Sequence, residues 1–255
     1  QADKANAMTR DFWQEFPLAI KSLAEQADLR VLVISGDGKH FCSGMDLSVF
    51  SNNLALNNSN ARERERLRCL VEDLQSVFTQ IEKLKVPVIA TVQGACVGGG
   101  LDLISACDLR YAVSSAFFCI QEINLAMMAD LGSLQRLPKL IPMGIVRELA
   151  YTGDRLSADR AYELGFLNGV FATEEDMLIE VLSVAAKIAA KSPLAISASK
   201  ESINFARDNT VAASLGQAAI LQSSILDVGD LEISARAMAK RAEASFDPLL
   251  TKSTL

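Results

Sequence analysis

Three adjacent glycines and three acids are the residues of this sequence whose types and spacing favour chemistry. The glycines, Gly98-Gly-Gly100, follow a predicted buried strand and precede a predicted helix. Such a turn leaves unpaired backbone N–H groups at one point in space. Asp102 lies in the first turn of that helix, and Glu122 and Asp130 follow among mostly apolar neighbours. Backbone donors beside isolated carboxylates favour proton transfer next to a carbonyl group, with the N–H of Gly99 as one donor.

Each of these features also has a purely structural explanation. The glycine triplet could be a tight turn, and it lacks the G-x-G-x-x-G spacing of a dinucleotide site. Asp102 could simply stabilise the start of a helix, and its position favours the ionised form. Glu122 and Asp130 could be turn carboxylates. However, apolar surroundings raise a carboxyl pKa and neighbouring carboxyls separate their pKa values, so such a pair can hold one base and one acid.

The loop at residues 39–46 is the predicted source of a second backbone donor. It follows an apolar strand, and Gly44 lets its backbone approach a ligand closely. We expect the donor at Ser43-Gly44. Ser43 itself is a poor nucleophile candidate, because no motif places a histidine or lysine beside it. His40 could orient a ligand phosphate, although a structural hydrogen bond is the simpler interpretation.

Composition limits the classes of protein to consider. A chain of 255 residues that is 50% hydrophobic predicts one large domain, or one domain with a small appendage. The net charge of −6 argues against nucleic-acid binding. Five scattered cysteines suit buried free thiols, and a single histidine gives no multi-histidine metal site, so no metal is expected. The polar start and the polar residues within 209–226 predict neither a signal peptide nor a membrane span, so we expect a cytoplasmic protein.

The apolar pattern predicts an α/β body followed by helices. Strands are expected at 30–35, 88–92, 108–113 and 116–120, irregular chain at 48–58, and helices at 8–27 (kinked or broken at Pro17), 61–84, within 133–152, and after Ser157 and Thr173. Alternating apolar strands and helices predict a parallel sheet with crossover helices. Residues after 176 are almost entirely helical in pattern. The predicted domains are therefore an α/β core at 1–175 and a helical region at 176–255.

Five motifs together resemble the enoyl-CoA hydratase/isomerase (crotonase) superfamily. They are Lys4-Ala-Asn-Ala-Met8, His40-Phe-Cys-Ser-Gly-Met-Asp46, Val88-Ile-Ala-Thr-Val-Gln-Gly94, Gly98-Gly-Gly-Leu-Asp102 and Ala106-Cys-Asp-Leu-Arg110. The resemblance covers nearly the whole chain and implies a spiral of ββα units whose helical C-terminal region forms a homotrimer or a dimer of trimers. It also implies an acyl-CoA thioester substrate, with coenzyme A as part of the substrate and no separate cofactor.

The same resemblance implies roles for particular residues. The thioester oxygen would lie between the N–H groups of Ser43 and Gly99. Substrate contacts would come from the residues Lys4, Ala5, Ser43, Gly44, Met45, Asp46 and Gly99. These assignments follow from the matching motif positions.

The three acids resemble those of the Δ3,5-Δ2,4-dienoyl-CoA isomerases within this superfamily. Hydratases carry two glutamates at the positions of Asp102 and Glu122, whereas this chain has an aspartate at the first and adds Asp130. The resemblance implies conversion of 3,5-dienoyl-CoA to 2,4-dienoyl-CoA in β-oxidation of unsaturated fatty acids. Asp130 would be the base, Glu122 the distal acid, and Asp102 a support for the pocket. The alternatives are a 2-enoyl-CoA hydratase and a non-catalytic CoA- or RNA-binding scaffold.

Overall fold

The strands of the protein form two small sheets. The computed structural model describes residues 1–46, 48–51 and 60–249. The main sheet has the order β1 (Leu32–Ser35), β2 (Val88–Val92), β4 (Leu109–Val113) and β7 (Gly169–Phe171), with every neighbouring pair parallel. The second has the order β3 (Ala95–Val97), β5 (Phe117–Cys119) and β6 (Leu156–Ser157), with β3 and β5 parallel and β6 antiparallel. The predicted α/β fold with a parallel sheet is confirmed.

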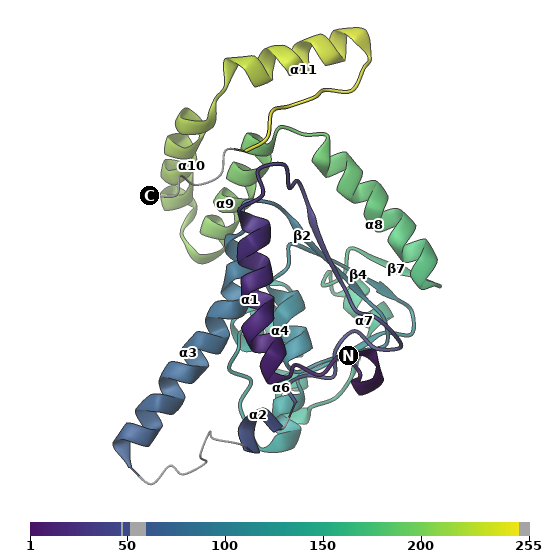
Figure 1. Cartoon of the computed structure of the whole chain (residues 1–255), viewed down its shortest axis with the longest axis vertical. Helices are drawn as coiled ribbons and strands as arrows, with labels where there is room; N and C mark the ends of the chain where they lie inside the picture. Colours follow the sequence, from purple (N-terminus) through teal and green to yellow (C-terminus); the bar gives the residue numbers. More distant parts are fainter. Residues whose placement is uncertain (47, 52–59, 250–255) are drawn as a thin grey trace.

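Helices of varied length alternate with these strands along the first two thirds of the chain. They are η1 (Ala2–Lys4), α1 (Arg10–Ala24), α2 (Ser48–Ser51), α3 (Ala61–Lys83), α4 (Gly99–Ser105), η2 (Gln121–Leu125), α5 (Ser133–Arg136), η3 (Leu137–Lys139), α6 (Met143–Thr152) and α7 (Ala158–Glu163). The predicted caps are confirmed, because the side chains of Ser157 and Thr173 accept N–H groups at the starts of α7 and α8. Figure 1 shows α1 and α4 on one side of the main sheet and α8 on the other.

The core lies around β2. All five of its residues are buried, as expected for a strand covered on both faces of a parallel sheet. Phe78 and Ile81 of α3 are fully buried in the same cluster, and so are the rings of Phe118 and Phe166, which meet edge to face. This core fixes the end of β2, from which the chain runs through β3 into the glycine triplet.

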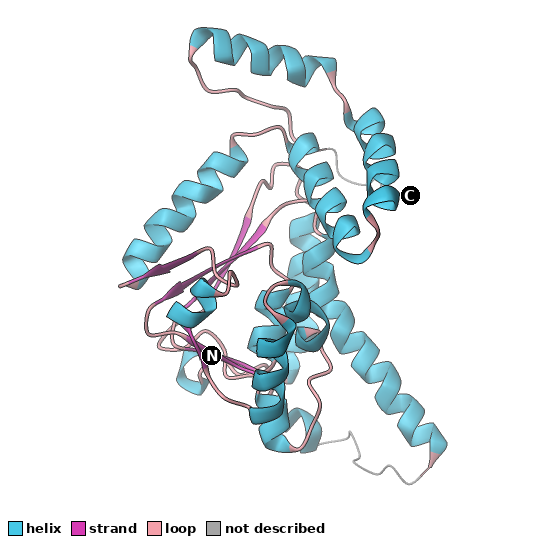
Figure 2. Ribbon diagram, turned by 180° about the vertical axis from the view of Figure 1, so that it is seen from behind, coloured by secondary structure: helices cyan, strands magenta, loops and turns pink. Residues whose placement is uncertain are grey.

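Four further helices complete the chain: α8 (Glu174–Ala189), α9 (Pro193–Asp208), α10 (Val211–Ile225) and α11 (Val228–Lys240). Met177 and Val181 of α8 are buried in the core, so α8 packs on the sheet. Figures 1 and 2 show α10 and α11 at one end of the molecule, apart from the strands. These two helices expose large apolar side chains, namely Val211, Leu215, Ile220, Val228, Leu231 and Met238. The domain division near residue 175 stays a prediction.

Several local expectations were wrong. Helix α1 runs unbroken through Pro17, and residues 48–51 are helical, while 52–58 lie outside the described residues. Strands β3, β6 and β7 have two or three residues each, too few to show a periodic pattern. Cys69 is exposed on α3, whereas the other four cysteines are buried free thiols.

Across the described part of the chain, no single helix is long and apolar enough to cross a bilayer. Helices α10 and α11 together meet the length and composition requirement, but they are bent by 83° at the break.

Candidate active site

The N-terminal residues lie against the predicted substrate loop. Met8 and Met45 form a parallel bridge, in which the Met8 N–H donates to Gly44 O (2.8 Å) and the Asp46 N–H donates to Met8 O (3.1 Å). The carbonyl of Ala5 accepts the N–H of Ser43 at 2.9 Å. The structure therefore brings this N-terminal segment together with residues 43–46.

Charge at this loop is set by its own residues and by Lys4. Hydrogen bonds from Ser48 lower the pKa of Asp46 below its ordinary value, and the positive charge of Lys4 lowers it further. The side chain of Lys4 is exposed, so its ammonium is available to a ligand anion.

Two backbone N–H groups are left free where this loop meets α4. Neither the N–H of Gly99 nor that of Met45 donates to any described residue, and a Cβ built on Gly99 would lie 3.9 Å from the Met45 nitrogen. The predicted pairing of Ser43 with Gly99 does not fit this geometry, because the Ser43 N–H is already bound to Ala5. The N–H of Met45, two residues further along the chain, makes no such bond and lies close to Gly99.

The close approach at the glycine triplet excludes side chains. Gly98 has φ +52°, and a Cβ there would lie 3.1 Å from Oε1 of Glu122. A Cβ on Gly99 would lie 2.8 Å from the sulfur of Met8. The triplet therefore combines a left-handed turn with contacts to two separate segments.

Asp102 is fully buried on α4. Its Oδ1 accepts the N–H of Ser133 at 2.6 Å, and its Oδ2 has no partner among the described residues. Burial raises the pKa of Asp102 to about 6, although the hydrogen bonds with Ser133 and the charge of Arg136 oppose the rise. With a pKa of about 6, Asp102 is still mainly ionised at neutral pH, as its position in the first helix turn favours, but burial offsets part of that stabilisation.

Glu122 and Asp130 flank the same space from η2 and from the segment before α5. Burial raises the pKa of Glu122 to about 7, and repulsion from Asp102 and Asp130 contributes to the rise. Its Oε2 has no partner among the described residues. Burial also raises the pKa of Asp130 above its ordinary value. The three acids therefore share one electrostatic environment, and the prediction that apolar surroundings raise the pKa of Glu122 and Asp130 is confirmed.

Two side chains that the sequence did not single out hold the Asp130 segment. Nε2 of Gln75 on α3 donates to the carbonyl of Asp130 at 2.6 Å, and Nη1 of Arg136 donates to the carbonyl of Leu131 at 3.2 Å. Bonds from a side chain to a distant carbonyl leave no periodic signal. Neither Gln75 nor Arg136 could be found from its spacing along the chain.

Among the described residues, no three histidine, cysteine, aspartate or glutamate side chains form a group that could hold a metal ion. His40 accepts the N–H of Ala95 through Nδ1 at 3.1 Å. The expectation that His40 makes a structural hydrogen bond is confirmed.

Comparison with known proteins agrees with this geometry. The family model described as enoyl-CoA hydratase/isomerase matches residues 1–248. The chain belongs to the enoyl-CoA hydratase/isomerase family. The crotonase-like fold expected from the motifs is also confirmed. An enoyl-CoA hydratase from Bacillus anthracis superposes with a TM-score of 0.87 and 28% identity, over 97% of this chain and 92% of that one.

Relatives in this family carry two kinds of name. The peroxisomal Δ3,5-Δ2,4-dienoyl-CoA isomerase of Arabidopsis thaliana is 41% identical over 96% of this chain and 89% of its own length. The human mitochondrial protein of that name is 39% identical over 94% and 74%. A crotonyl-CoA hydratase of Syntrophomonas wolfei is 36% identical over 78% and 73%.

These names also correct the expected location. The dienoyl-CoA isomerases are named as peroxisomal or mitochondrial proteins, so the expectation of a cytoplasmic family member was wrong. That expectation rested on the lack of a signal at the start of the sequence. Address signals are short segments that the folded core does not require, so the core carries no trace of them.

Proposed function

We propose that this protein isomerises 3,5-dienoyl-CoA to 2,4-dienoyl-CoA. The observation that carries the proposal is the pair formed by Glu122, whose pKa is about 7, and Asp130, beside two free backbone donors. At neutral pH about half of Glu122 is protonated, so one carboxyl can donate a proton while another accepts one. The dienoyl-CoA isomerase names of the relatives, at about 40% identity over most of the chain, support the same reaction.

In this mechanism the base is Asp130. Its carboxylate removes a proton from carbon 2, next to the thioester, and the electron pair moves to the thioester oxygen. The N–H groups of Met45 and Gly99 stabilise the resulting enolate, with Met45 replacing the donor first expected at Ser43. Glu122 then protonates carbon 6, and the double bonds at 3,4 and 5,6 become double bonds at 2,3 and 4,5.

The proton balance closes within the site. After one turnover Asp130 carries the proton taken from carbon 2, and Glu122 has become a carboxylate. Transfer of that proton from Asp130 to Glu122 restores both groups. Asp102 stays out of direct contact in this scheme, and its negative charge favours the protonated form of Glu122.

The N-terminal residues are proposed to bind the remainder of the substrate, in a protein that forms an oligomer. Lys4, Ala5 and the 43–46 loop are proposed to hold coenzyme A, where the exposed ammonium of Lys4 suits a phosphate. The apolar surface of α10 and α11 suits burial against other copies of the chain, in a trimer or a dimer of trimers.

A 2-enoyl-CoA hydratase is the second candidate. Oδ2 of Asp102 and Oε2 of Glu122 are both buried and unpartnered among the described residues, which suits two groups that hold a water. One relative is named a crotonyl-CoA hydratase. However, Asp102 is one methylene shorter than glutamate, and Ser133 already occupies its other oxygen.

One assay separates these activities. Purified protein is given a 3,5-dienoyl-CoA or a 2-enoyl-CoA, and ultraviolet absorbance follows formation of the conjugated 2,4-diene or loss of the enoyl thioester. We expect formation of the 2,4-diene. Hydration of the 2-enoyl substrate with no isomerisation would make the protein a hydratase, and turnover of neither would favour a non-catalytic scaffold.

Asp130→Asn tests the assignment of the base. The variant should lose isomerisation while it still binds the CoA ester, since only the proton acceptor is removed. Asp159→Asn, an exposed first-turn aspartate of α7, is the matched control and should keep full activity. Unchanged turnover of Asp130→Asn would remove Asp130 from the mechanism.

A further inference from the structure

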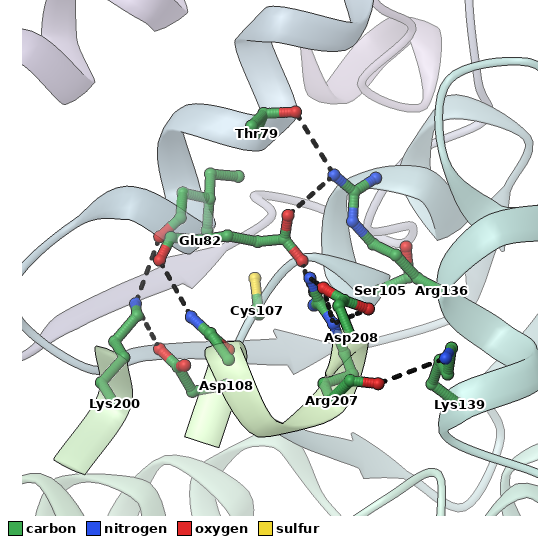
Figure 3. Close-up of polar contacts among 12 residues, drawn as sticks. Thr79, Glu82, Ser105, Cys107, Asp108, Arg136, Lys139, Lys200, Arg207 and Asp208 are labelled. Atoms are coloured by element: carbon green, nitrogen blue, oxygen red, sulfur yellow. Dashed lines mark hydrogen bonds and ion pairs between the residues drawn. The ribbon is translucent and has the colours of Figure 1, made fainter. Parts of the chain in front are cut away.

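Glu82 joins two arginines that come from distant parts of the chain. It lies in the last turn of α3, where Oε2 accepts Nη2 of Arg136 at 3.1 Å and Oε1 accepts Nη1 of Arg207 at 2.5 Å (Figure 3). The side chains of Glu82 and Arg136 are only 14% and 11% exposed. Burial alone would raise the pKa of Glu82, but the hydrogen bonds from both arginines lower it below its ordinary value. A shielded bridge of this kind is costly to break at one end only.

Arg136 reaches the segment that carries Asp130. Its Nη1 donates to the carbonyl of Leu131, the residue after Asp130. The guanidinium also lies against the backbone of Gly132, where a Cβ would come within 1.7 Å of Nη1. One side of Arg136 therefore holds the Asp130 segment, and its other side is held by Glu82.

Arg207 belongs to the C-terminal helices. It lies in the last turn of α9, whose residues Lys200 and Asn204 donate to main-chain carbonyls in the last turn of α3. Lys139, which follows α5, donates to the carbonyl of Arg207 at 3.2 Å (Figure 3). Helix α10 packs directly on α9. The end of α9 is thus tied both to α3 and to the segment after Arg136.

We propose that Arg136 and Arg207, joined through Glu82, are positioning residues that set the place of Asp130, so that helix α9 is part of the active-site scaffold. The proposal rests on the proposed role of Asp130 as the base. A base must be held within hydrogen-bond reach of the proton that it removes, and small displacements are costly in rate. Neither arginine needs to touch the substrate.

A purely structural bridge is the competing explanation. The buried ion pair between Lys200 and Asp108, at 2.7 Å, joins the same helix α9 to the core without reaching the acids. Bonds of that kind contribute to stability alone. If the Glu82 bridge did the same, its loss would lower the melting temperature and leave the rate constants unchanged.

The test is a double-mutant cycle on turnover. Arg207→Gln and Arg136→Gln should each lower kcat about tenfold with little change in KM, because binding is kept while the base is displaced. The double variant should be no slower than Arg136→Gln, since one break already disconnects the bridge. Arg207→Lys should restore part of kcat. The matched control is Arg160→Gln, which breaks an exposed ion pair with Glu163 on α7 and should be neutral.

Two kinetic results would overturn the proposal. One is a lower melting temperature of Arg207→Gln with kcat unchanged. The other is a double variant whose loss is the product of the two single losses, which would mean that the two arginines act separately.

Hydrogen exchange gives a readout that does not depend on the reaction. Peptides covering residues 129–133 should exchange faster in Arg207→Gln than in Arg160→Gln, whichever CoA ester the enzyme converts. If the wild type fails to isomerise a dienoyl-CoA, the proposed function is wrong. The exchange experiment still shows whether the Glu82 bridge positions the Asp130 segment. Equal exchange in the two variants would show that α9 does not position this segment.

Discussion

The backbone N–H of Ser133 donates a 2.6 Å hydrogen bond to one oxygen of Asp102, and the other oxygen of that carboxylate has no partner among the described residues. The buried group is therefore only half satisfied. Its pKa is raised to about 6, because burial penalises the ionised form of the carboxyl. A penalty of this kind is common where a carboxylate serves a reaction rather than the stability of the fold.

The change in the free energy of unfolding caused by Asp102→Asn should be more favourable at pH 8 than at pH 4. The folded-state pKa lies above the value in the unfolded chain, so the folded protein binds the proton more tightly and loses stability as pH rises from about 4 through about 6. The loss approaches about 3 kcal/mol above that range. Asparagine stays neutral and can still accept the N–H of Ser133. Urea unfolding at the two pH values measures the difference, and an equal effect at both would contradict the buried charge.

Turnover should decline as pH rises above about 7, because Glu122 must carry the proton that it delivers. Asp102→Asn removes a negative charge that raises the pKa of Glu122. The alkaline limb of the kcat profile should then move to lower pH, while Asp130 and the surrounding apolar residues still act on Glu122. Measurement of kcat against pH at saturating substrate tests this, and an alkaline limb that stays in place would mean that Glu122 is not the acid.

Replacement of the Met45 amide by an ester should slow turnover by about a hundredfold to a thousandfold, as loss of one oxyanion donor does in other enzymes. The ester removes the N–H and keeps the side chain. The same replacement at Ser43 removes the bond to Ala5 instead, so kcat should stay within a few-fold of wild type. A larger loss at Ser43 than at Met45 would restore the donor first expected from the sequence.

Local patterns predicted the parts of the site that depend on neighbouring residues. The strand, glycine turn and helix start around Gly99 were predictable because each step has its own signal. The raised pKa values of Glu122 and Asp130 followed from the apolar character of the residues around them. Long strands and capped helices were predicted for the same reason.

What the sequence missed depends on contacts between distant segments. The choice between Ser43 and Met45 depends on contacts with the N-terminal segment, because Ala5 accepts the N–H of Ser43 while that of Met45 donates to no described residue. The ionisation of Asp102 depends on how completely α4 is covered. Residues such as Glu82 act through long-range bonds that have no fixed spacing along the chain.

The glycine triplet also limits how this protein can change during evolution. Gly98 faces Glu122 and Gly99 faces Met8, while a Cβ on Gly100 would lie 2.8 Å from the Cβ of Cys42. A side chain at any of the three would require a shift or a matching substitution in a different segment. Single substitutions there are therefore expected to destabilise the site. New reactions on this scaffold are more accessible through the acids at 122 and 130, whose side chains are only partly buried.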